Sequence, residues 1–528
     1  MPDHADQLEA IRGGYDVDGA ALDLGAAVAD GTAHADVPVR IPLSSLNRHG
    51  LVAGATGTGK TKTLQLMAEQ LSAQGVPVFL ADIKGDLSGV ASTGVPDDKV
   101  TARAAEVGQQ WEPTSCPTEF LSLGGLGAGV PVRATITSFG PTLLAKVLGL
   151  NDVQESSLAL VFHYADQNGL ALLDLKDLRA VITHLTSDEG KAELKELGGL
   201  SAATAGVILR ELIAFAAEGA DVFFGEPEFD TAELLRTTSD GRGFVTCLEL
   251  SDVQDKPALF STFLMWMLAD LFHDLPEVGD VDKPKLVFFF DEAHLLFDDA
   301  SEDFLDSISQ TVRLIRSKGV GVFFVTQTPK DVPGDVLAQL GNRVQHALRA
   351  YTPDDAKALK ATVSTFPRST YDLEELLTTL GTGEAVVTVL SERGAPTPVA
   401  WTRLRAPQSL MAPSAAGVVS AVVEASALRP KYAQALDRES AYEKLVARLA
   451  EAPAAAEPTR RREPKSSDRA AAPRKDRSAP APAPRKEPSV LENVVTSSAF
   501  KSALRSAGSV LGREITRSLF GTARRRRR

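Results

Sequence analysis

Cysteine and long apolar runs are scarce in this sequence. Cys116 and Cys247 are the two cysteines among 528 residues, too few for a disulfide framework and in keeping with a reducing compartment. The first residues lack the basic and apolar regions of a signal peptide. The most apolar stretch, residues 258–272, is short for a membrane span and contains Asp270, so we expect a buried helix there. These absences predict a cytoplasmic protein.

Positive charge is scarce in the body of the chain and concentrated at its end. Residues 1–450 carry 37 Lys/Arg against 61 Asp/Glu, whereas residues 451–528 carry 19 against 8. An acidic body argues against a protein that coats nucleic acid without selectivity. No cluster of basic and aromatic residues in the body indicates a nucleic-acid channel.

The segment from Gly54 to Thr61 matches the pattern G-x-x-x-x-G-K-[ST]. An apolar strand is predicted before it and a helix after it, which argues against a chance glycine-rich turn. Such a loop points its N–H groups at a phosphate, Lys60 reaches the β- and γ-phosphates, and the Thr61 hydroxyl ligates Mg²⁺. The predicted nucleotide-binding residues are Gly54, Ala55, Thr56, Gly57, Thr58, Gly59, Lys60, Thr61 and Lys62.

Apolar runs typical of strands recur along the body, with helical patterns between several of them. This alternation predicts a three-layer α/β domain with a mostly parallel central sheet. Residues 142–236 are rich in Leu, Ala and Glu without a clear strand, so we expect a helical insertion there. The predicted strands are residues 78–81, 244–250, 286–290, 320–325, 344–350 and 385–390.

Two carboxylates follow the apolar run 286–290. Ligands of such sheets bind at the carboxyl ends of the strands. Asp291 is therefore expected to hold Mg²⁺, and Glu292 to act as general base toward the attacking water. The letters Asp-Glu-Ala-His also occur in superfamily-2 RNA helicases, but the later motifs of those proteins are absent. We expect His294 to be structural or a relay, and no zinc site.

Polar and basic residues flank the predicted strand 320–325. Gln327 ends it and is placed to sense the γ-phosphate. Arg313 and Arg316 precede it and share one face of a predicted helix. Either arginine offered to a neighbouring subunit's γ-phosphate would accelerate hydrolysis, although the spacing equally fits a solvated basic face.

These motifs, taken in order, resemble the HerA/FtsK superfamily of ring-forming ATPases, and most closely its bacterial HerA-helicase-like branch. The phosphate loop, Asp82-Ile-Lys-Gly-Asp-Leu, Phe-Phe-Asp-Glu-Ala-His, Arg-Leu-Ile-Arg-Ser-Lys-Gly and Val-Thr-Gln-Thr-Pro carry the resemblance over residues 35–410. It implies a RecA-like P-loop NTPase fold, hexamers and ATP sites between subunits. It also implies roles for Arg316 as the catalytic arginine, Gln327 as sensor and Asp82 as an accessory contact to catalytic water or metal.

One departure limits this resemblance. Archaeal HerA has an N-terminal β-barrel domain, for which the residues before Pro38 leave no room. The assembly and nuclease partnership associated with that barrel are therefore not carried over.

We predict five regions. They are a lead-in (1–37), the ATPase domain (38–410), a helical extension (411–450), a disordered Pro/Ala/Arg linker (451–489), and an amphipathic helix with a basic tail (490–528). The last region is expected to contact a partner protein, its own ring or a membrane surface. Its terminal arginines equally fit nucleic acid, anionic lipid or a solvated tail.

The sequence thus predicts a Mg²⁺-dependent ATPase that works as a homo-hexamer and moves duplex DNA. The alternative is a nucleotide-controlled assembly protein or a protein-translocating ATPase that does not act on nucleic acid.

Overall fold

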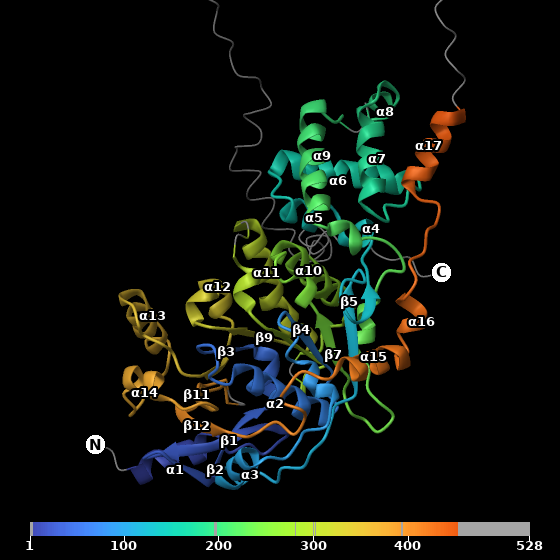
Figure 1. Ribbon diagram of the computed structural model, residues 1–528. Helices are drawn as coiled ribbons and strands as arrows, with labels where there is room; N and C mark the ends of the chain where they lie inside the picture. Colours follow the sequence, from blue (N-terminus) through green and yellow to red (C-terminus); the bar gives the residue numbers. More distant parts are fainter. Residues whose placement is uncertain are drawn as a thin grey trace, which may run out of the picture.

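A single mixed sheet forms the centre of the molecule (Figure 1). The computed structural model describes residues 4–194, 198–279, 281–298, 300, 302–391 and 394–451. Within these ranges the sheet has twelve strands in the order β2-β1-β12-β11-β10-β3-β9-β8-β4-β7-β5-β6. The strands are β1 (Ala21–Ala29), β2 (Thr32–Pro42), β3 (Gly50–Ala53), β4 (Val78–Asp82), β5 (Thr118–Leu123), β6 (Val130–Val132), β7 (Val245–Glu249), β8 (Leu286–Phe290), β9 (Val320–Thr326), β10 (Asn342–Gln345), β11 (Glu384–Thr388) and β12 (Ala400–Leu404).

The strands from β10 to β6 run parallel, and the four strands beyond β10 run antiparallel. The predicted mostly parallel α/β sheet is therefore confirmed. Central strands buried on both faces require continuous apolar sequence. In β8, Phe288 and Phe290 pack on one face of the sheet and Val287 and Phe289 on the other.

Helices cover both faces of the sheet and complete three layers. One face carries α2 (Lys60–Ala73), and the other carries α10 (Pro257–Asp274) and α11 (Glu302–Ile315). The apolar stretch 258–272 forms most of α10, which is a buried core helix as expected. Among the described residues, no helix combines the length and apolarity that a membrane span needs. Cys116 and Cys247 are free thiols.

A helical lobe stands clear of the sheet at the top of Figure 1. It lies between β6 and β7, and α5 packs against α10 and α11 of the core. Several of its helices begin with a capping residue, such as Asn151 and Asp174, whose side chain accepts a backbone N–H of the first turn. Its helices are α4 (Ile136–Phe139), α5 (Pro141–Val147), α6 (Asp152–Gln167), α7 (Leu175–Thr186), α8 (Asp188–Glu193) and α9 (Ala202–Ala217).

The first residues take part in the sheet, contrary to their reading as a lead-in. After α1 (His4–Gly14), strand β1 pairs with both β2 and β12, and the Tyr15 hydroxyl donates to the Val387 carbonyl at 2.8 Å. The predicted boundary at residue 37 falls inside β2. Composition misses this hairpin because the first five residues of β2, 32–36, are exposed or half-buried and carry no apolar run. The division into domains otherwise stays a prediction.

The remaining helices follow the chain around the edges of the sheet. Those at the carboxyl end of the described chain run from β5 to the helical lobe, where α17 packs on α7. The predicted linker and basic tail lie outside the described residues from 452 onward. These helices are α3 (Asp98–Glu106), α12 (Gly334–Leu337), α13 (Pro353–Val363), α14 (Leu373–Thr379), α15 (Ala416–Ala425), α16 (Arg429–Tyr432) and α17 (Ala441–Glu451).

Candidate nucleotide site

The phosphate loop lies between the end of β3 and the start of α2, as the sequence predicts. Gly57 has φ of 80° and Gly59 has φ of 116°, a region in which only glycine is comfortable. Gly54 passes close to the core, where an added Cβ would lie 2.5 Å from the His346 Cβ. The glycines therefore give the loop its curve and bring its backbone against β10.

Lys60 occupies the inside of this curve. Its side chain is buried, and its Nζ donates to the Gly54 carbonyl at 2.6 Å and to the Ala55 carbonyl at 3.3 Å. Burial lowers the pKa of Lys60, while the nearby Glu292 and Asp291 raise it. The ammonium thus lies between the loop carbonyls and the carboxylates that follow β8, where a bound phosphate would need a counter-charge.

Asp291 and Glu292 are both buried at the carboxyl end of β8. Glu292 adopts the left-handed conformation (φ 45°, ψ 46°) at the start of a 3₁₀ turn, Ala293–Leu296, which costs about 1–2 kcal/mol for a residue with a side chain. Burial, and then the charges of Glu292 and Asp86, raise the pKa of Asp291 to about 7. Asp291 Oδ2 and Glu292 Oε2 accept no hydrogen bond, so each keeps an oxygen for a ligand.

A loop after β4 brings two further charged residues to the site. Lys84 forms an ion pair with Glu292 Oε1, and the Thr61 hydroxyl donates to Asp86 Oδ2 at 3.4 Å. Asp82 fixes this loop, because its carboxylate accepts the N–H groups of Gly85 and Leu87, each at 2.8 Å. Backbone amides thus occupy Asp82, whose predicted contact with water or metal stays a prediction.

The arrangement fits Mg²⁺ bound together with a nucleotide. Among the described residues, no group of three or more His, Cys, Asp or Glu side chains could hold a metal alone. Mg²⁺ commonly takes only one or two protein carboxylates and completes its shell with phosphate and water. Asp291 lies near the Lys60 ammonium, the Thr61 hydroxyl donates to Asp86, and buried Asp86 Oδ1 has no hydrogen-bond partner. This donor set is consistent with the predicted pair Thr61 and Asp291.

Gln327 follows β9 at the same edge of the sheet. It is exposed and makes no side-chain hydrogen bond with any described residue. The preceding Thr326 hydroxyl donates to Asp331 Oδ2 at 2.8 Å, which anchors the turn Pro329–Asp331. Gln327 is thus held at the carboxyl edge on a fixed backbone, and its role as sensor stays a prediction.

Arg313 and Arg316 lie at the opposite edge of the sheet. Helix α11 ends at Ile315, so Arg316 begins a separate 3₁₀ turn, Arg316–Lys318, closed by Gly319 at φ 76°. Both arginines are exposed and precede the amino end of β9. A seven-residue strand spans roughly 23 Å. Arg316 therefore lies too far away to reach the phosphate loop of its own chain.

Two histidines border the site. His294 Nδ1 lies 3.3 Å from Glu292 Oε2, a position that suits the structural or relay role expected for it. His346 is fully buried after β10, and its ring lies 2.9 Å from the Thr63 hydroxyl. Burial, and then the charge of Lys60, lower the pKa of His346 to about 4. A neutral imidazole therefore supports the first turn of α2 behind the phosphate loop.

Sequence reasoning missed Lys84, Asp86 and His346. Each follows a parallel strand at its carboxyl end, which is the signal that would have found them. The predicted strand 344–350 obscured His346, because the ladder ends at Gln345 and the next residues pair with the phosphate loop instead.

Comparisons with known proteins point to one family. A sequence model of the family described as "Helicase HerA-like C-terminal" matches residues 28–528. The DNA double-strand break repair helicase HerA of Sulfolobus acidocaldarius is 21% identical over 355 residues, which cover 67% of this chain and 64% of that protein. Its counterpart in Saccharolobus solfataricus is 22% identical over the same shares. The chain thus spans about two thirds of the length of these relatives.

Solved structures give weaker likenesses. The bacterial conjugative coupling protein TrwBdeltaN70 is 15% identical with a TM-score of 0.49, over 77% of this chain and 95% of its own. VirB4 of Thermoanaerobacter pseudethanolicus is 16% identical with a TM-score of 0.47, over 74% of this chain and 98% of its own. At such scores these likenesses carry no argument about function.

Proposed function

This chain belongs to the helicase HerA-like C-terminal family of P-loop ATPases, and on that premise we propose that it hydrolyses ATP in a ring of identical subunits and uses the energy to move duplex DNA. The observation that carries the hydrolytic half is the convergence of Lys60, Thr61, Asp291 and Glu292 at one edge of the sheet. Asp291 Oδ2 and Glu292 Oε2 are buried, accept no hydrogen bond and belong to carboxylates near the buried Lys60 ammonium.

Each residue has a proposed task in the reaction. The phosphate loop and Lys60 bind and orient the β- and γ-phosphates. Glu292 accepts a proton from the water that attacks the γ-phosphorus, while the bond between that phosphorus and its bridging oxygen breaks and ADP leaves. Mg²⁺, held by Thr61 and Asp291, supplies charge neutralisation on the phosphate oxygens when it is bound. Gln327 orients the γ-phosphate or its water from the next strand.

The position of Arg316 supports an assembly of several copies. Its distance from the phosphate loop of its own chain means that it serves a γ-phosphate only if a neighbouring subunit presents one. Head-to-tail contacts between identical subunits generate closed rings. In such a ring Arg316 of each subunit would face the phosphate loop of its neighbour. Six copies are the number that the family resemblance implies.

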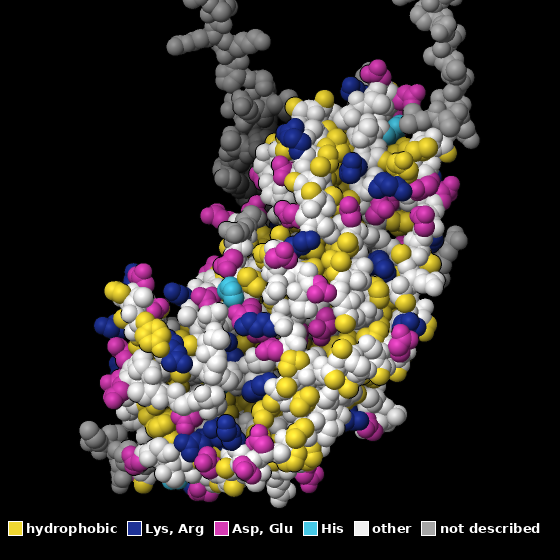
Figure 2. Space-filling model, viewed as in Figure 1, with side chains coloured by type: hydrophobic (Ala, Val, Ile, Leu, Met, Phe, Trp, Pro, Cys, Tyr) yellow, Lys and Arg dark blue, Asp and Glu magenta, His cyan; other side chains and the backbone are white. Residues whose placement is uncertain are grey.

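The DNA half of the proposal comes from the relatives, whose printed names describe helicases of DNA repair. The face of the molecule seen in Figure 2 interleaves basic and acidic side chains instead of showing one basic stripe. We therefore expect DNA to contact the assembled ring through residues that the ring brings together, with phosphate contacts that depend on salt.

The test measures ATP turnover with and without duplex DNA over a salt series from about 50 to 200 mM. We expect stimulation that falls steeply as salt rises, because counterions released from DNA oppose binding. Turnover that no nucleic acid changes, in a protein that still hydrolyses ATP, would contradict DNA as the substrate. It would favour the alternative of an assembly or protein-translocating ATPase.

A further inference from the structure

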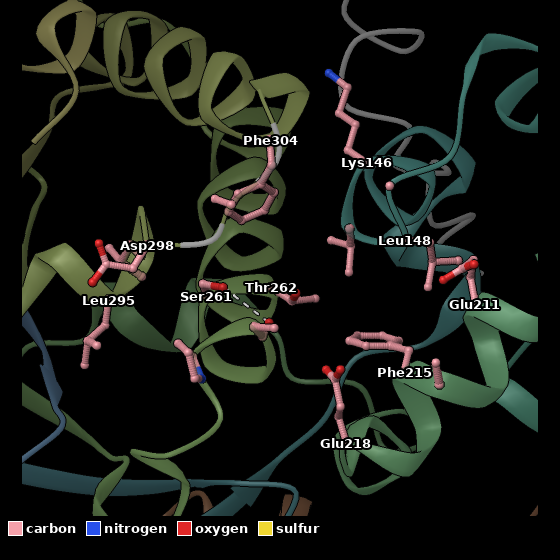
Figure 3. A pocket seen from close by; sticks show the side chains of 17 residues that line it. Lys146, Leu148, Glu211, Phe215, Glu218, Ser261, Thr262, Leu295, Asp298 and Phe304 are labelled. Carbon is pink, nitrogen blue, oxygen red and sulfur yellow. Dashed lines mark hydrogen bonds between the residues drawn. The ribbon is translucent and has the colours of Figure 1, made fainter.

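A cleft separates the helical lobe from the ATPase core. It has a volume of roughly 340 Å³. One wall comes from α5 and α9 of the lobe, and the other comes from α10, the turn after β8 and the start of α11 (Figure 3). Leu148 and Phe215 line the lobe side, and Leu295, Leu296 and Phe304 line the core side. A cleft of this size admits one or two large apolar side chains.

The lobe side of the cleft also carries acidic side chains. Glu211 and Glu218 of α9 and the following turn line it, and Figure 3 shows the Glu218 carboxylate directed toward its interior. Neither carboxylate has a hydrogen-bond or ion-pair partner among the described residues. The sole cation in the lining, Lys146, donates to Ser307 Oγ of α11 at 2.7 Å. The cleft therefore combines apolar side chains on both walls with unpaired carboxylates on its lobe side.

The chain itself contains a segment with the complementary chemistry. We propose that residues 490–528 dock in this cleft. Their apolar residues Phe500, Leu504, Leu511, Ile515 and Leu519 recur at helical spacing, and Lys or Arg follows the first two directly. The segment contains nine Lys/Arg and two Asp/Glu, so apolar anchors and cations lie side by side in its sequence, as a cleft that combines apolar side chains with carboxylates requires.

The chain has the length to bring this segment to the cleft. The described chain ends with α17, which packs on α7; α7 packs on α9, and α9 lines the cleft. The path therefore crosses about two helix diameters and up to the length of α17, or roughly 35 Å. The intervening residues, 452–489, would span about 35 Å as a random chain. Docking thus needs no rearrangement of the described residues.

Docking there would place the segment against the turn that carries the proposed general base. Leu295 and Leu296 of the cleft belong to the 3₁₀ turn Ala293–Leu296, which begins directly after Glu292. That glutamate already adopts a left-handed backbone and has one oxygen that accepts no hydrogen bond. The docked segment would therefore restrict the position of Glu292. Docking of residues 490–528 itself does not depend on ATP hydrolysis by this chain.

The test uses photo-crosslinking in the full-length chain, with a benzophenone-bearing phenylalanine in place of Ala214, an exposed cleft residue of α9. Mass spectrometry is expected to find crosslinks to peptides from residues 490–528. Ala203, exposed on the same helix about 16 Å away, gives the matched control, in which we expect about tenfold fewer such crosslinks.

Charge reversal tests the chemistry of the docking. The double variant Glu211→Lys, Glu218→Lys should lower the crosslink yield by about tenfold, and adding Arg505→Glu with Arg513→Glu should restore it. The reversal Asp166→Lys, Glu439→Lys, at exposed acids outside the cleft lining, should leave the yield unchanged. Far-ultraviolet circular dichroism checks that every variant is folded. Crosslinks to other peptides, no crosslink at all, or a yield insensitive to Glu211 and Glu218 would each overturn the proposal.

Discussion

The two edges of the central sheet carry different chemistry. At the carboxyl edge, Lys60, Asp291 and Glu292 are buried close together, and one oxygen of each carboxylate accepts no hydrogen bond. At the amino edge, Arg313 and Arg316 are exposed. The carboxyl edge thus has buried carboxylate oxygens that can accept hydrogen bonds or bind a cation. The amino edge has exposed guanidinium groups that can contact another molecule.

This difference suggests that different subunits supply different parts of one catalytic site. A buried site can exclude water and fix charges but cannot supply an arginine from 20 Å or so away. An exposed arginine on a short turn is free to meet a surface that only assembly provides. The edges would then be two halves of one catalytic site, each belonging to a different subunit, and the variants below separate them.

The largest effects are expected at the carboxyl edge. Glu292→Gln should lower ATP turnover by about 10⁴-fold because the amide cannot accept the proton from water, while bound ATP, measured by filter binding, is retained. Lys60→Ala should instead abolish nucleotide binding, since the buried ammonium is the counter-charge of the phosphates. Wild-type turnover in the Glu292 variant would refute its assignment as base.

A loss of about 10³-fold is expected from Arg316→Ala, the size typical of an arginine that acts on a neighbour's phosphate. Mixing this variant with Lys60→Ala chains should restore part of the turnover, because a ring then contains interfaces with both intact halves. Arg179→Ala, exposed on α7 of the helical lobe, serves as the matched control. Failure of mixing to restore turnover would show that the two edges do not cooperate between subunits.

A smaller change is expected at the contact between Lys84 and Glu292. Lys84→Ala should lower turnover by about tenfold, because the glutamate loses the ion pair that positions its side chain. Lys84→Arg keeps a cation and should retain most of the activity. Lys99→Ala, exposed on α3, controls for a mere change of net charge. Equal rates for Lys84→Ala and the wild type would remove this loop from the site.

Each edge also contains one buried histidine, and these are expected to set how stability depends on pH. Burial lowers the pKa of both His49 and His346 to about 4, whereas an unfolded chain titrates near 6.5. Below pH 6.5 the unfolded state therefore binds more protons, and the free energy of unfolding falls as the pH decreases toward 4. Between pH 7.5 and 5, urea denaturation should show a loss of about 2 kcal/mol per histidine.

Variants locate this pH effect at each edge. His49→Asn keeps an acceptor for the Val322 N–H, and His346→Gln keeps a polar partner for Thr63. Each should reduce the pH dependence of stability by about 2 kcal/mol. An unchanged dependence in both variants would mean that other groups govern acid unfolding.

The sequence predicts most of the carboxyl edge because its motifs are local. The loop Gly54–Thr61 and the run Leu286–Phe290 each combine a strand and its following polar residues within a few positions, and the structure places both as expected. Local pattern also identifies α10 as a buried helix and the helical character of residues 142–236. What these residues do in catalysis remains predicted from chemistry and resemblance.

Contacts between distant segments escaped sequence analysis. Lys84 meets Glu292 across 208 positions, and His346 meets Thr63 across 283. The order of strands, which no local pattern records, brings these partners together. The β1–β2 hairpin was missed for a related reason. Its place in the sheet depends on pairing between β1 and β12, whose residues Thr402 and Leu404 lie far away along the chain.

Strand β9 joins the two edges. It begins after Arg316 and ends before Gln327, and its seven residues are all buried between β3 and β8. A rigid strand of this kind cannot shift at one end without shifting at the other. If Arg316 contacts a neighbour's nucleotide as proposed, a shift of Arg316 would move Gln327 through β9. The nucleotide state of one subunit would then change the position of Gln327 at the γ-phosphate of the next. Strand β9 would then couple ATP hydrolysis in one subunit to hydrolysis in its neighbour and so set the order in which the subunits of a ring hydrolyse ATP.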